Sequence, residues 1–428
     1  MINKLNVLFS GAQVGRLAIG NRQIRFEYDK AWIENGLDLS PGTLLFNGNA
    51  NESVRPSQFE GLPGVFNDSL PDGWGLLLMD RVFKQRFSLD PHQITPLDRL
   101  GYMGHRGMGA LEYQPEILPD DDDDDVDLSD LALQAEKIMD DDTCEVLEKL
   151  RIYGGSPGGA RPKVTVAMSN DGKRCLSGFN TIPANYSHWM VKFRNDSKSG
   201  TPDPVDIGKL EKAYAEMADL AGIHMPKSRL IDVAMGKRKE SFFAVKRFDR
   251  DGNRKIHFLS LSGYIHANHR EPCISYEAGV IPATKKLTKS DDEASKAFRL
   301  MVFNVLAHNK DDHAKNFAFI HDGSWKLSPA FDLTFSGGIN NEHTTAINGS
   351  GNPKFSDIAA VAKQAKIARW DSILDEVRHA VSQWPSIAAT QGLSKPRING
   401  IEKSLRSIDK DCAPVSVSTA PPRRRSPK

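Results

Sequence analysis

HNKDDHAKNFAFIHDGSWKLSPAFDL, residues 308–333, predicts a polar loop that leads into a β-hairpin. Phe317–Ile320 and Trp325–Leu327 are short apolar runs of strand length, and the His-Asp-Gly-Ser segment between them is typical of a turn. Upstream, apolar residues recur at helical spacing from Phe298 to Val305, so a helix is expected to run into the loop. The predicted order is therefore helix, polar loop, hairpin and a final Pro-Ala-Phe-Asp-Leu segment.

Three side chains in this stretch have the spacing that phosphoryl transfer requires. Asp311 stands five residues before Asn316, as the base and the metal-ligand asparagine do in the catalytic loop of protein kinases. Asp332 follows the hairpin and is expected to return beside Asn316 as a second oxygen ligand for Mg²⁺. His313 or Lys315 could contact the phosphates from the same loop. These residues predict a kinase site with Asp311 as its catalytic base.

Metal-dependent hydrolysis is the alternative chemistry, because two histidines and two aspartates fall within six residues, from His308 to His313. The two histidines are five residues apart, so a helix would not place both on one face, and no further His/Asp pair is positioned to complete a metal shell. A polar surface loop without function is the other alternative. The three residues at kinase spacing favour phosphoryl transfer over both.

A glycine-rich segment, GGSPGGARPKV at residues 154–164, could hold phosphate groups. Its glycines permit backbone conformations in which N–H groups turn towards anionic oxygens. It is neither a Walker A loop nor the G-x-G-x-x-G of ordinary protein kinases, and a plain loop is the alternative. Lys192 follows inside the apolar run HWMVKF, either as an edge-strand lysine facing water or as the lysine that contacts the α- and β-phosphates. The glycine loop upstream favours the second.

Two further segments fit the N-terminal lobe of a kinase. Residues 207–221 have helical periodicity, and Glu211 or Glu216 could pair with the kinase lysine, although a solvated glutamate is the alternative for each. The strand FFAVKRFD, residues 242–249, lies where a kinase hinge would offer backbone groups to adenine. The order along the chain is therefore glycine loop, lysine strand, helix, hinge and catalytic loop.

The first thirty residues predict antiparallel strands, with apolar runs at Leu5–Phe9, Val14–Ile19 and Ile24–Tyr28 separated by turn residues. A stretch rich in proline and glycine follows, and its Leu-Pro-Asp-Gly turn precedes a helix predicted from about Trp74 to Phe87. Asp72 could cap that helix, because an aspartate at this position can accept a hydrogen bond from the first turn.

The chain has 428 residues, with 56 Lys and Arg against 55 Asp and Glu, and its 39% hydrophobic and 26% charged residues are typical of a globular protein. This length predicts two or three domains. The net charge of +1 conceals an acidic run at residues 120–127 and a basic tail at 413–428, which we interpret as a solvated loop and a disordered segment. Without a membrane-spanning run, a signal peptide or a CxxC pair, a cytoplasmic protein without disulfides or membrane contact is expected.

In this order, the segments resemble the HipA family of bacterial toxin kinases, over about residues 5–410. The resemblance rests on FNDSLPDGWG near the start, SPGGARPK in the middle, VKRFDR at the hinge, and FNVLAHNKDDHAKNFAF with PAFDL near the end. The last two segments are highly specific together, and the others are moderately so.

The resemblance implies an α+β, bilobal protein-kinase-like fold, related to phosphoinositide kinases, with a β-rich N-terminal subdomain and an all-helical C-terminal lobe. It divides the chain into five parts: the β-rich subdomain, an acidic loop, a kinase N-lobe with the glycine-rich loop and hinge, a helical C-lobe with the catalytic loop, and a disordered basic tail. The corresponding residues are 1–115, 116–129, 130–250, 251–412 and 413–428.

The same resemblance implies the site of an ATP- and Mg²⁺-dependent Ser/Thr protein kinase. Asp311 would be the catalytic base, and Asn316 and Asp332 would be the Mg²⁺ ligands. Ser156 falls on the position at which family kinases phosphorylate themselves, and about −1.5 to −2 of added charge there would repel the ATP phosphates. The implied ATP contacts are Gly158, Gly159, Ala160, Arg161, Pro162, Lys163, Lys192, Lys246, Arg247, Phe248, His313, Lys315 and Phe331.

Partners are implied by the resemblance as well. Family members pair with a small helix-turn-helix antitoxin that binds DNA as a dimer, and several phosphorylate aminoacyl-tRNA synthetases. The resemblance implies a toxin that phosphorylates a cellular protein to arrest growth and that reaches operator DNA mainly through a separate, HipB-like antitoxin. The alternative is a catalytically weak, ATP-binding co-repressor that acts with a DNA-binding antitoxin.

Overall fold

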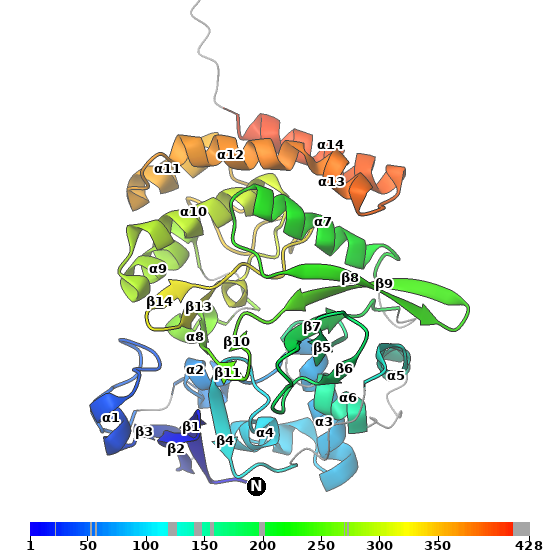
Figure 1. Ribbon diagram of the computed structural model, residues 1–428. Helices are drawn as coiled ribbons and strands as arrows, with labels where there is room; N and C mark the ends of the chain where they lie inside the picture. Colours follow the sequence, from blue (N-terminus) through cyan, green and yellow to red (C-terminus); the bar gives the residue numbers. More distant parts are fainter. Residues whose placement is uncertain are drawn as a thin grey trace, which may run out of the picture.

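Alternating apolar residues form the N-terminal sheet, as the sequence predicts. In β3 (Gln23–Tyr28), Ile24, Phe26 and Tyr28 are buried and the residues between them are exposed, so one face of the strand packs on the core. The antiparallel sheet has the order β3-β2-β1-β4, which brings β4 from the end of the domain beside β1 (Figure 1). The other elements are β1 (Lys4–Phe9), β2 (Ala12–Gly20), β4 (Leu111–Gln114), α1 (Lys30–Asn35), α2 (Gly64–Asn67), α3 (Gly73–Phe87) and α4 (Pro96–Met103).

This computed structural model describes residues 1–21, 23–51, 54–55, 58–118, 126–140, 148–154, 158–196, 202–268, 270–271 and 274–413. Three sequence predictions lie outside these ranges: the acidic run at 120–125, the phosphorylation site Ser156 and the basic tail from 414. Within the described ranges, no helix combines the length and the apolar character needed to cross a membrane.

A second, five-stranded antiparallel sheet carries the predicted lysine strand and hinge strand. Its order is β6-β5-β7-β9-β8, so the lysine strand β7 lies in the middle, between β5 and β9. The helix predicted at 207–221 forms as α7 and packs against β8 and β9. The elements are α5 (Leu128–Asp140), α6 (Glu148–Gly154), β5 (Lys163–Ser169), β6 (Cys175–Ser177), β7 (Tyr186–Lys192), α7 (Ile207–Leu220), β8 (Ser228–Met235) and β9 (Arg238–Lys246).

The C-terminal part is predominantly but not entirely helical, so the expectation of an all-helical lobe is wrong. The predicted hairpin forms as β13 and β14, and β13 also pairs with β12, which gives a three-stranded sheet. Ala318 and Phe319 of β13 are buried in it, and their burial explains why this segment is a strand. The strands are β10 (Arg250–Asp251), β11 (Arg254–Lys255), β12 (His257–Ser260), β13 (Ala318–His321) and β14 (Trp325–Leu327).

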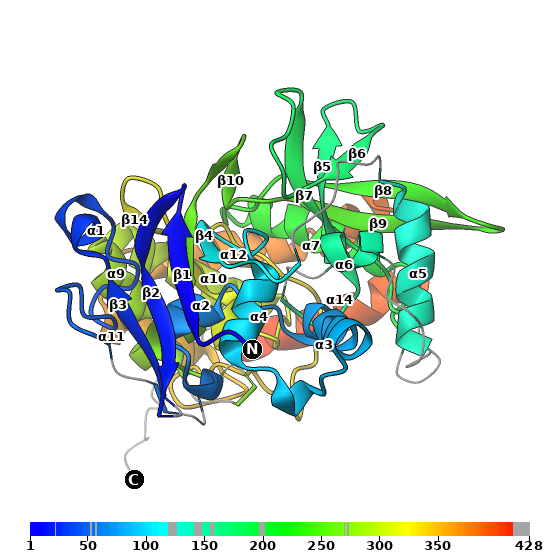
Figure 2. The same ribbon diagram turned by 90° about the horizontal axis from the view of Figure 1, so that it is seen from below.

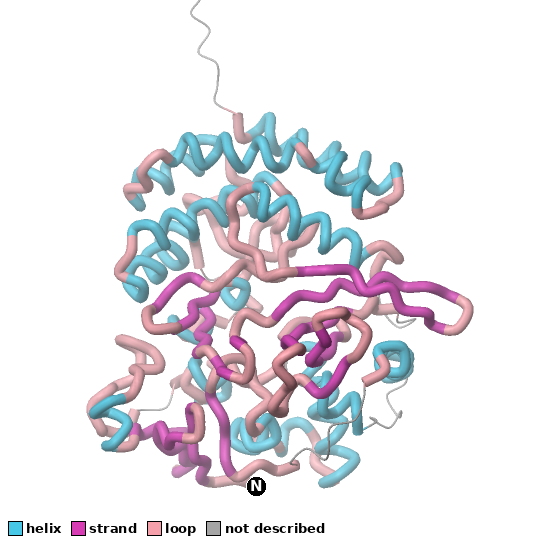
Figure 3. The backbone as a smooth tube through the Cα atoms, in the orientation of Figure 1, coloured by secondary structure: helices cyan, strands magenta, loops and turns pink. Residues whose placement is uncertain are grey.

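Two helical layers lie over the strands of the C-terminal part (Figure 3). The inner layer contains α7, α9 and α10, and the outer layer contains α11 to α14 (Figure 1). The predicted helix before the catalytic loop is α10, whose N-cap is Ser290 with three acidic residues in the first turn. The helices are α8 (Leu261–Ile265), α9 (Ile281–Thr288), α10 (Asp291–Leu306), α11 (Phe355–Ala365), α12 (Trp370–Ser382), α13 (Trp384–Thr390) and α14 (Lys395–Asp411).

One hydrophobic core combines residues of the N-terminal part with residues of the five-stranded sheet. Helix α3 belongs to the N-terminal part, yet its Trp74 and Leu78 share a core with Val164 of β5 and Val191 of β7. Both views place α3 against α6 (Figures 1 and 2), and these two helices are in contact. The first turn of α3 is therefore fixed beside the glycine loop that precedes β5.

Candidate active site

A cavity between the five-stranded sheet and the catalytic loop gathers most of the predicted residues. It encloses about 1180 Å³ of empty space, including its open mouth, which is ample for a small-molecule ligand. Ala160, Arg161, Pro162 and Asp311 are described by the structure but are not part of the lining. The predicted residues that line it are Gly158, Gly159, Lys163, Lys192, Lys246, Arg247, Phe248, His313, Lys315, Asn316, Phe331 and Asp332.

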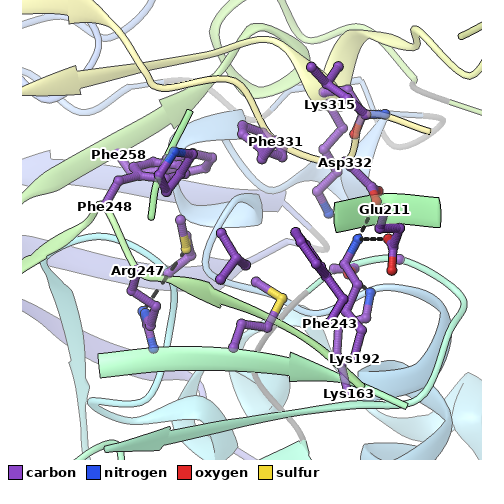
Figure 4. Close-up of a pocket in the computed structure, with 18 of the residues that line it drawn as sticks. Lys163, Lys192, Glu211, Phe243, Arg247, Phe248, Phe258, Lys315, Phe331 and Asp332 are labelled. Carbon is purple, nitrogen blue, oxygen red and sulfur yellow. Dashed lines mark hydrogen bonds and ion pairs between the residues drawn. The ribbon is translucent and has the colours of Figure 1, made fainter. Parts of the chain in front are cut away.

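Lys192 joins two carboxylates at the polar end of the cavity (Figure 4). Its ammonium lies 2.7 Å from Glu211 Oε1 on α7 and 2.5 Å from Asp332 Oδ1 after the hairpin. Burial opposes the charge of Lys192, but Asp332 and Glu211 together raise its pKa above the ordinary value. Lys192 in turn holds the pKa of Asp332 far below its usual range. Lys192 is therefore a buried, paired cation on a central strand, and the edge-strand alternative is wrong.

Glu211, and not Glu216, is the helical partner of this lysine. Glu211 is buried, and although burial alone would raise its pKa, Lys192 and Arg161 keep the pKa below the ordinary value. Glu216 instead pairs with Lys212 at 3.1 Å, one turn away on the same helix. Arg161 contacts Glu211 Oε2 at 2.6 Å rather than lining the cavity, so the structure places it behind the lysine pair.

The catalytic loop holds Asp311 next to His313, which lines the cavity. Its side chain is 55% exposed, and Nε2 of His313 lies 3.9 Å from Oδ1. Partial burial raises the pKa of Asp311 above its ordinary value, the carboxylates of Asp332 and Asp312 raise it further, and His313 opposes the shift. Asn316 donates from Nδ2 to the backbone carbonyl of Asp311 at 2.8 Å. An exposed carboxylate at this place can accept a proton from a group that approaches from solvent.

Asp312, the neighbour of Asp311, anchors the catalytic loop through hydrogen bonds to residues outside the loop. Its carboxylate is fully buried and accepts hydrogen bonds from the backbone N–H of Thr344 at 2.9 Å and of Thr345 at 3.2 Å. Tyr276 Oη donates to it at 2.9 Å, and His343 Nδ1 lies at the same distance. Sequence reasoning missed this role, because two adjacent aspartates do not show which is buried. The polar His-Thr-Thr run at 343–345 is the only signal that could have indicated a partner.

Asp312→Ala is expected to destabilise the protein by about 3 kcal/mol, because four donors would be left around an empty buried position. Denaturant unfolding measures the change. Asp322→Ala is the matched control: Asp322 pairs with Arg254 at 2.8 Å but is 45% exposed, and its loss should cost less than about 1 kcal/mol. Equal losses for the two variants would show that Asp312 is not an anchor.

The glycine loop contributes backbone and one lysine to the cavity. Gly158, Gly159 and Lys163 line it, and the ammonium of Lys163 donates to the carbonyl of Gly158 at 2.5 Å. Burial, together with repulsion from Lys192, lowers the pKa of Lys163 to about 8. Gly159 has φ +98, a conformation that favours glycine. The loop therefore places a cation and a backbone N–H group in the cavity wall near the Lys192 pair.

The other end of the cavity is apolar (Figure 4). Phe248 and Phe331 stack with ring centroids 5.7 Å apart and an interplanar angle of 29°, and Phe258 lies beside Phe248 in the same space. The guanidinium of Arg247 is turned away to the buried Asp249, with Nη2 at 2.6 Å from Oδ2. A flat aromatic ligand could pack against these rings.

Four cavity residues that sequence reasoning did not assign to the site come from the N-terminal domain: Asp68, Leu70, Asp72 and Met108. Asp72 precedes α3 as predicted, but its side chain makes no capping hydrogen bond to the helix. It accepts instead from Gly159 N–H and from the ammonium of Lys315, which lies 2.9 Å from Oδ2. No local pattern could have shown these contacts, because the partners are 87 and 243 residues away in the sequence.

Asn316 and Asp332 offer the oxygen atoms that Mg²⁺ prefers. The hydrogen bond from Asn316 Nδ2 to the carbonyl of Asp311 turns the amide oxygen away from that carbonyl, and both residues line the cavity. Mg²⁺ usually binds one or two carboxylates together with waters and substrate phosphates, and this pair fits that pattern. In the described part of the chain, no group of three or more His, Cys, Asp or Glu residues is placed to hold a metal.

Two family descriptions match the chain: the HipA N-terminal domain over residues 5–114 and the HipA-like C-terminal domain over residues 155–384. The chain belongs to the HipA family. Residues 5–114 contain the N-terminal sheet, and the second range contains every predicted site residue. The HipA-family resemblance predicted from the sequence is thereby confirmed.

Similar proteins and structures agree with this assignment. "Putative kinase Y4dM" of Sinorhizobium fredii is 27% identical over 242 residues, which cover 52% of this chain and 56% of that protein. "Putative kinase Y4mE" of the same organism is 24% identical over 361 residues, 78% of this chain and 77% of that protein. A Shewanella oneidensis HipA, solved with HipB and operator DNA, has TM-score 0.68 at 16% identity, covering 95% of this chain and 96% of that chain. This likeness confirms a HipA-type fold.

Proposed function

We propose that this HipA-family protein is an ATP- and Mg²⁺-dependent Ser/Thr protein kinase and the toxin of a toxin–antitoxin pair. The observation that carries the proposal is the buried Lys192 ammonium held between Glu211 and Asp332 at the polar end of the cavity. Kinases require such a lysine–glutamate pair next to the metal-binding aspartate. The names of the Sinorhizobium relatives support kinase chemistry.

The shape and charge of the cavity support ATP as the phosphoryl donor. Adenine would pack against the Phe248–Phe331 pair, and the backbone of Lys246–Phe248 would offer hinge contacts. The triphosphate would extend towards Lys163 and Lys192, whose charges stabilise anionic oxygens. Bound at Asn316 and Asp332, Mg²⁺ would supply neutralising charge to the phosphates.

In this proposal Asp311 is the base. A serine or threonine hydroxyl of the protein substrate would reach the mouth of the cavity, where Asp311 is half exposed. The hydroxyl oxygen of the substrate would attack the γ-phosphorus of ATP, and the bond between the γ-phosphorus and the oxygen that bridges to the β-phosphate would break. ADP would leave, and Asp311 would accept the hydroxyl proton. The raised pKa of Asp311 makes its carboxylate a better proton acceptor than an ordinary aspartate.

Partners and regulation follow from family membership and are part of the proposal. The Shewanella HipA was solved together with HipB and operator DNA, and we propose a HipB-like antitoxin for this chain, which would provide most of the contact to DNA. A cellular protein, with an aminoacyl-tRNA synthetase as one candidate, would be the target of a cytoplasmic kinase. Ser156 would be the site of inhibitory autophosphorylation.

Incubation of the purified protein with γ-labelled ATP and a bacterial lysate tests the proposal. Label is expected on serine or threonine of the kinase itself and of at least one lysate protein, and a chelator should remove more than about 90% of it because Mg²⁺ is required. Label that persists in the presence of the chelator would contradict Mg²⁺ dependence. Wild-type protein that binds ATP but labels nothing would be the co-repressor rather than the kinase.

A further inference from the structure

The Asp72–Trp74 segment, where α3 begins, reaches from the N-terminal domain into the cavity. The two carboxylate oxygens of Asp72 accept from two separate parts of the site: Oδ1 from the backbone N–H of Gly159, and Oδ2 from Lys315 Nζ at 2.9 Å. The side chain of Asp72 is only 14% exposed, and it lines the cavity together with both partners. One negative charge therefore links the glycine loop to the catalytic loop.

The segment is held in place by more than the carboxylate. The backbone N–H of Trp74 donates to the carbonyl of Gly159 at 3.1 Å, and its indole Nε1 donates to the carbonyl of Lys163 at the same distance. Gly73 has φ +47, and a Cβ there would lie 2.6 Å from the carbonyl oxygen of Gly159, so only glycine permits this approach. Asp72 is thus a fixed part of the wall rather than a loose surface side chain.

The two donors that Asp72 uses are of the kinds that bind phosphate. Backbone N–H groups of a glycine-rich loop and a lysine ammonium both favour anionic oxygens. Each donor can satisfy a carboxylate or a phosphate oxygen, and two anions at the same donors repel each other. Asp68 is a second carboxyl in the lining and adds to this repulsion; burial raises its pKa to about 6, and the charge of Asp72 contributes to the rise.

We propose that Asp72 of the N-terminal domain competes with the nucleotide's phosphates for Gly159 N–H and Lys315. The inference rests on the proposed function, since it concerns the same cavity. To bind there, a phosphate must displace the carboxylate from the Gly159 N–H and compete with it for the Lys315 ammonium. The N-terminal domain thereby lowers the affinity of the site for phosphorylated nucleotides. The effect is confined to the phosphate end, because the aromatic end is lined by Phe248, Phe258 and Phe331.

Asp72→Asn tests the competition with little change of shape. The amide oxygen still accepts from Gly159, while the charge and the ion pair with Lys315 are lost. Isothermal titration of the full chain should show Mg-ATP and Mg-ADP binding on the order of tenfold tighter than in the wild type, because the like charge is removed. Adenosine has no phosphate, and its affinity should be unchanged.

Asp90→Asn is the matched control. Asp90 belongs to the same domain and pairs with Lys84 at 2.8 Å, but neither residue lines the cavity. Asp72→Ser provides a second variant with a hydrogen-bond acceptor and no charge, and it should also tighten Mg-ATP binding. Unchanged or weaker Mg-ATP binding in folded Asp72→Asn protein would overturn the competition. Absence of ATP binding in every variant and in the wild type would instead contradict the proposed function itself.

Discussion

Asp311→Asn is expected to lower the rate of phosphoryl transfer by about three orders of magnitude and to leave ATP affinity nearly unchanged. The amide cannot accept the hydroxyl proton, whereas the backbone carbonyl of Asp311, which holds Asn316, is retained. Asp311 is not part of the cavity lining, so ATP loses no direct contact. Single-turnover labelling measures the rate, and isothermal titration measures ATP affinity.

Stability and pH dependence separate this role from a structural one. With the side chain of Asp311 55% exposed, its replacement should change the free energy of unfolding by less than about 0.5 kcal/mol. The base must be ionised, so the wild-type rate should rise with pH through the raised pKa of Asp311, and the variant should lack this rise. Asp322→Asn is the control: Asp322 lies in the turn between β13 and β14, and its replacement should leave the rate of phosphoryl transfer at the wild-type value. If Asp311→Asn kept more than about a tenth of the rate, another group would be the base.

Local patterns predicted the parts of the site that lie close together in the sequence. Two features could be predicted because each lies within one loop or one turn: the spacing from Asp311 to Asn316 and the hairpin before Asp332. The pairing of β13 with β12 was not, since the strand at residues 257–260 forms only through contacts with a segment some sixty residues later. The all-helical lobe was implied by the family resemblance, whereas the residue pattern predicted the hairpin and missed its partner strand β12.

Long-range contacts explain the remaining differences at the site. Arg161 was grouped with the glycine loop by sequence, but the buried Glu211 on α7 attracts its guanidinium out of the cavity. Asp72 was expected to cap the helix that follows it, yet its carboxylate accepts hydrogen bonds from Gly159 and Lys315, which are far away in the sequence. The partners of a charged side chain are the groups that the tertiary fold brings close to it, and the local periodicity of the sequence does not predict them.

Lys192→Met is expected to reduce phosphoryl transfer by about 10³-fold and to destabilise the protein by about 3 kcal/mol at neutral pH. Methionine fills a similar volume but removes the cation between the buried Glu211 and the partly exposed Asp332. Because Glu211 is only 3% exposed, water cannot replace the lost ion pair. Urea unfolding and single-turnover labelling measure the two effects. Lys212→Met is the control, since its partner Glu216 is 38% exposed and the loss should stay below about 1 kcal/mol.

The destabilisation by Lys192→Met should depend on pH in a defined direction. Lys192 lowers the pKa of Glu211 and of Asp332 in the folded protein. This stabilisation is therefore present above the ordinary carboxyl pKa of about 4.3 and is lost as the pH falls through the lowered values. The variant lacks it, so the difference in unfolding free energy between wild type and variant should shrink on going from pH 7 towards pH 3. A difference that stayed constant would mean that packing, and not charge, is lost.

A second substitution distinguishes the two contributions of Lys192. Glu211→Gln in the Lys192→Met background removes a buried carboxylate that keeps only Arg161 as its cation, so it should restore at least about 1 kcal/mol of stability. The amide can still accept from Arg161, which contacts Glu211 at 2.6 Å in the wild type. Phosphoryl transfer should stay as low as in the single variant, because the cation at position 192 is still missing. Recovery of stability without recovery of phosphoryl transfer would show that the Lys192–Glu211 pair is needed for the reaction and not for the stability of the fold.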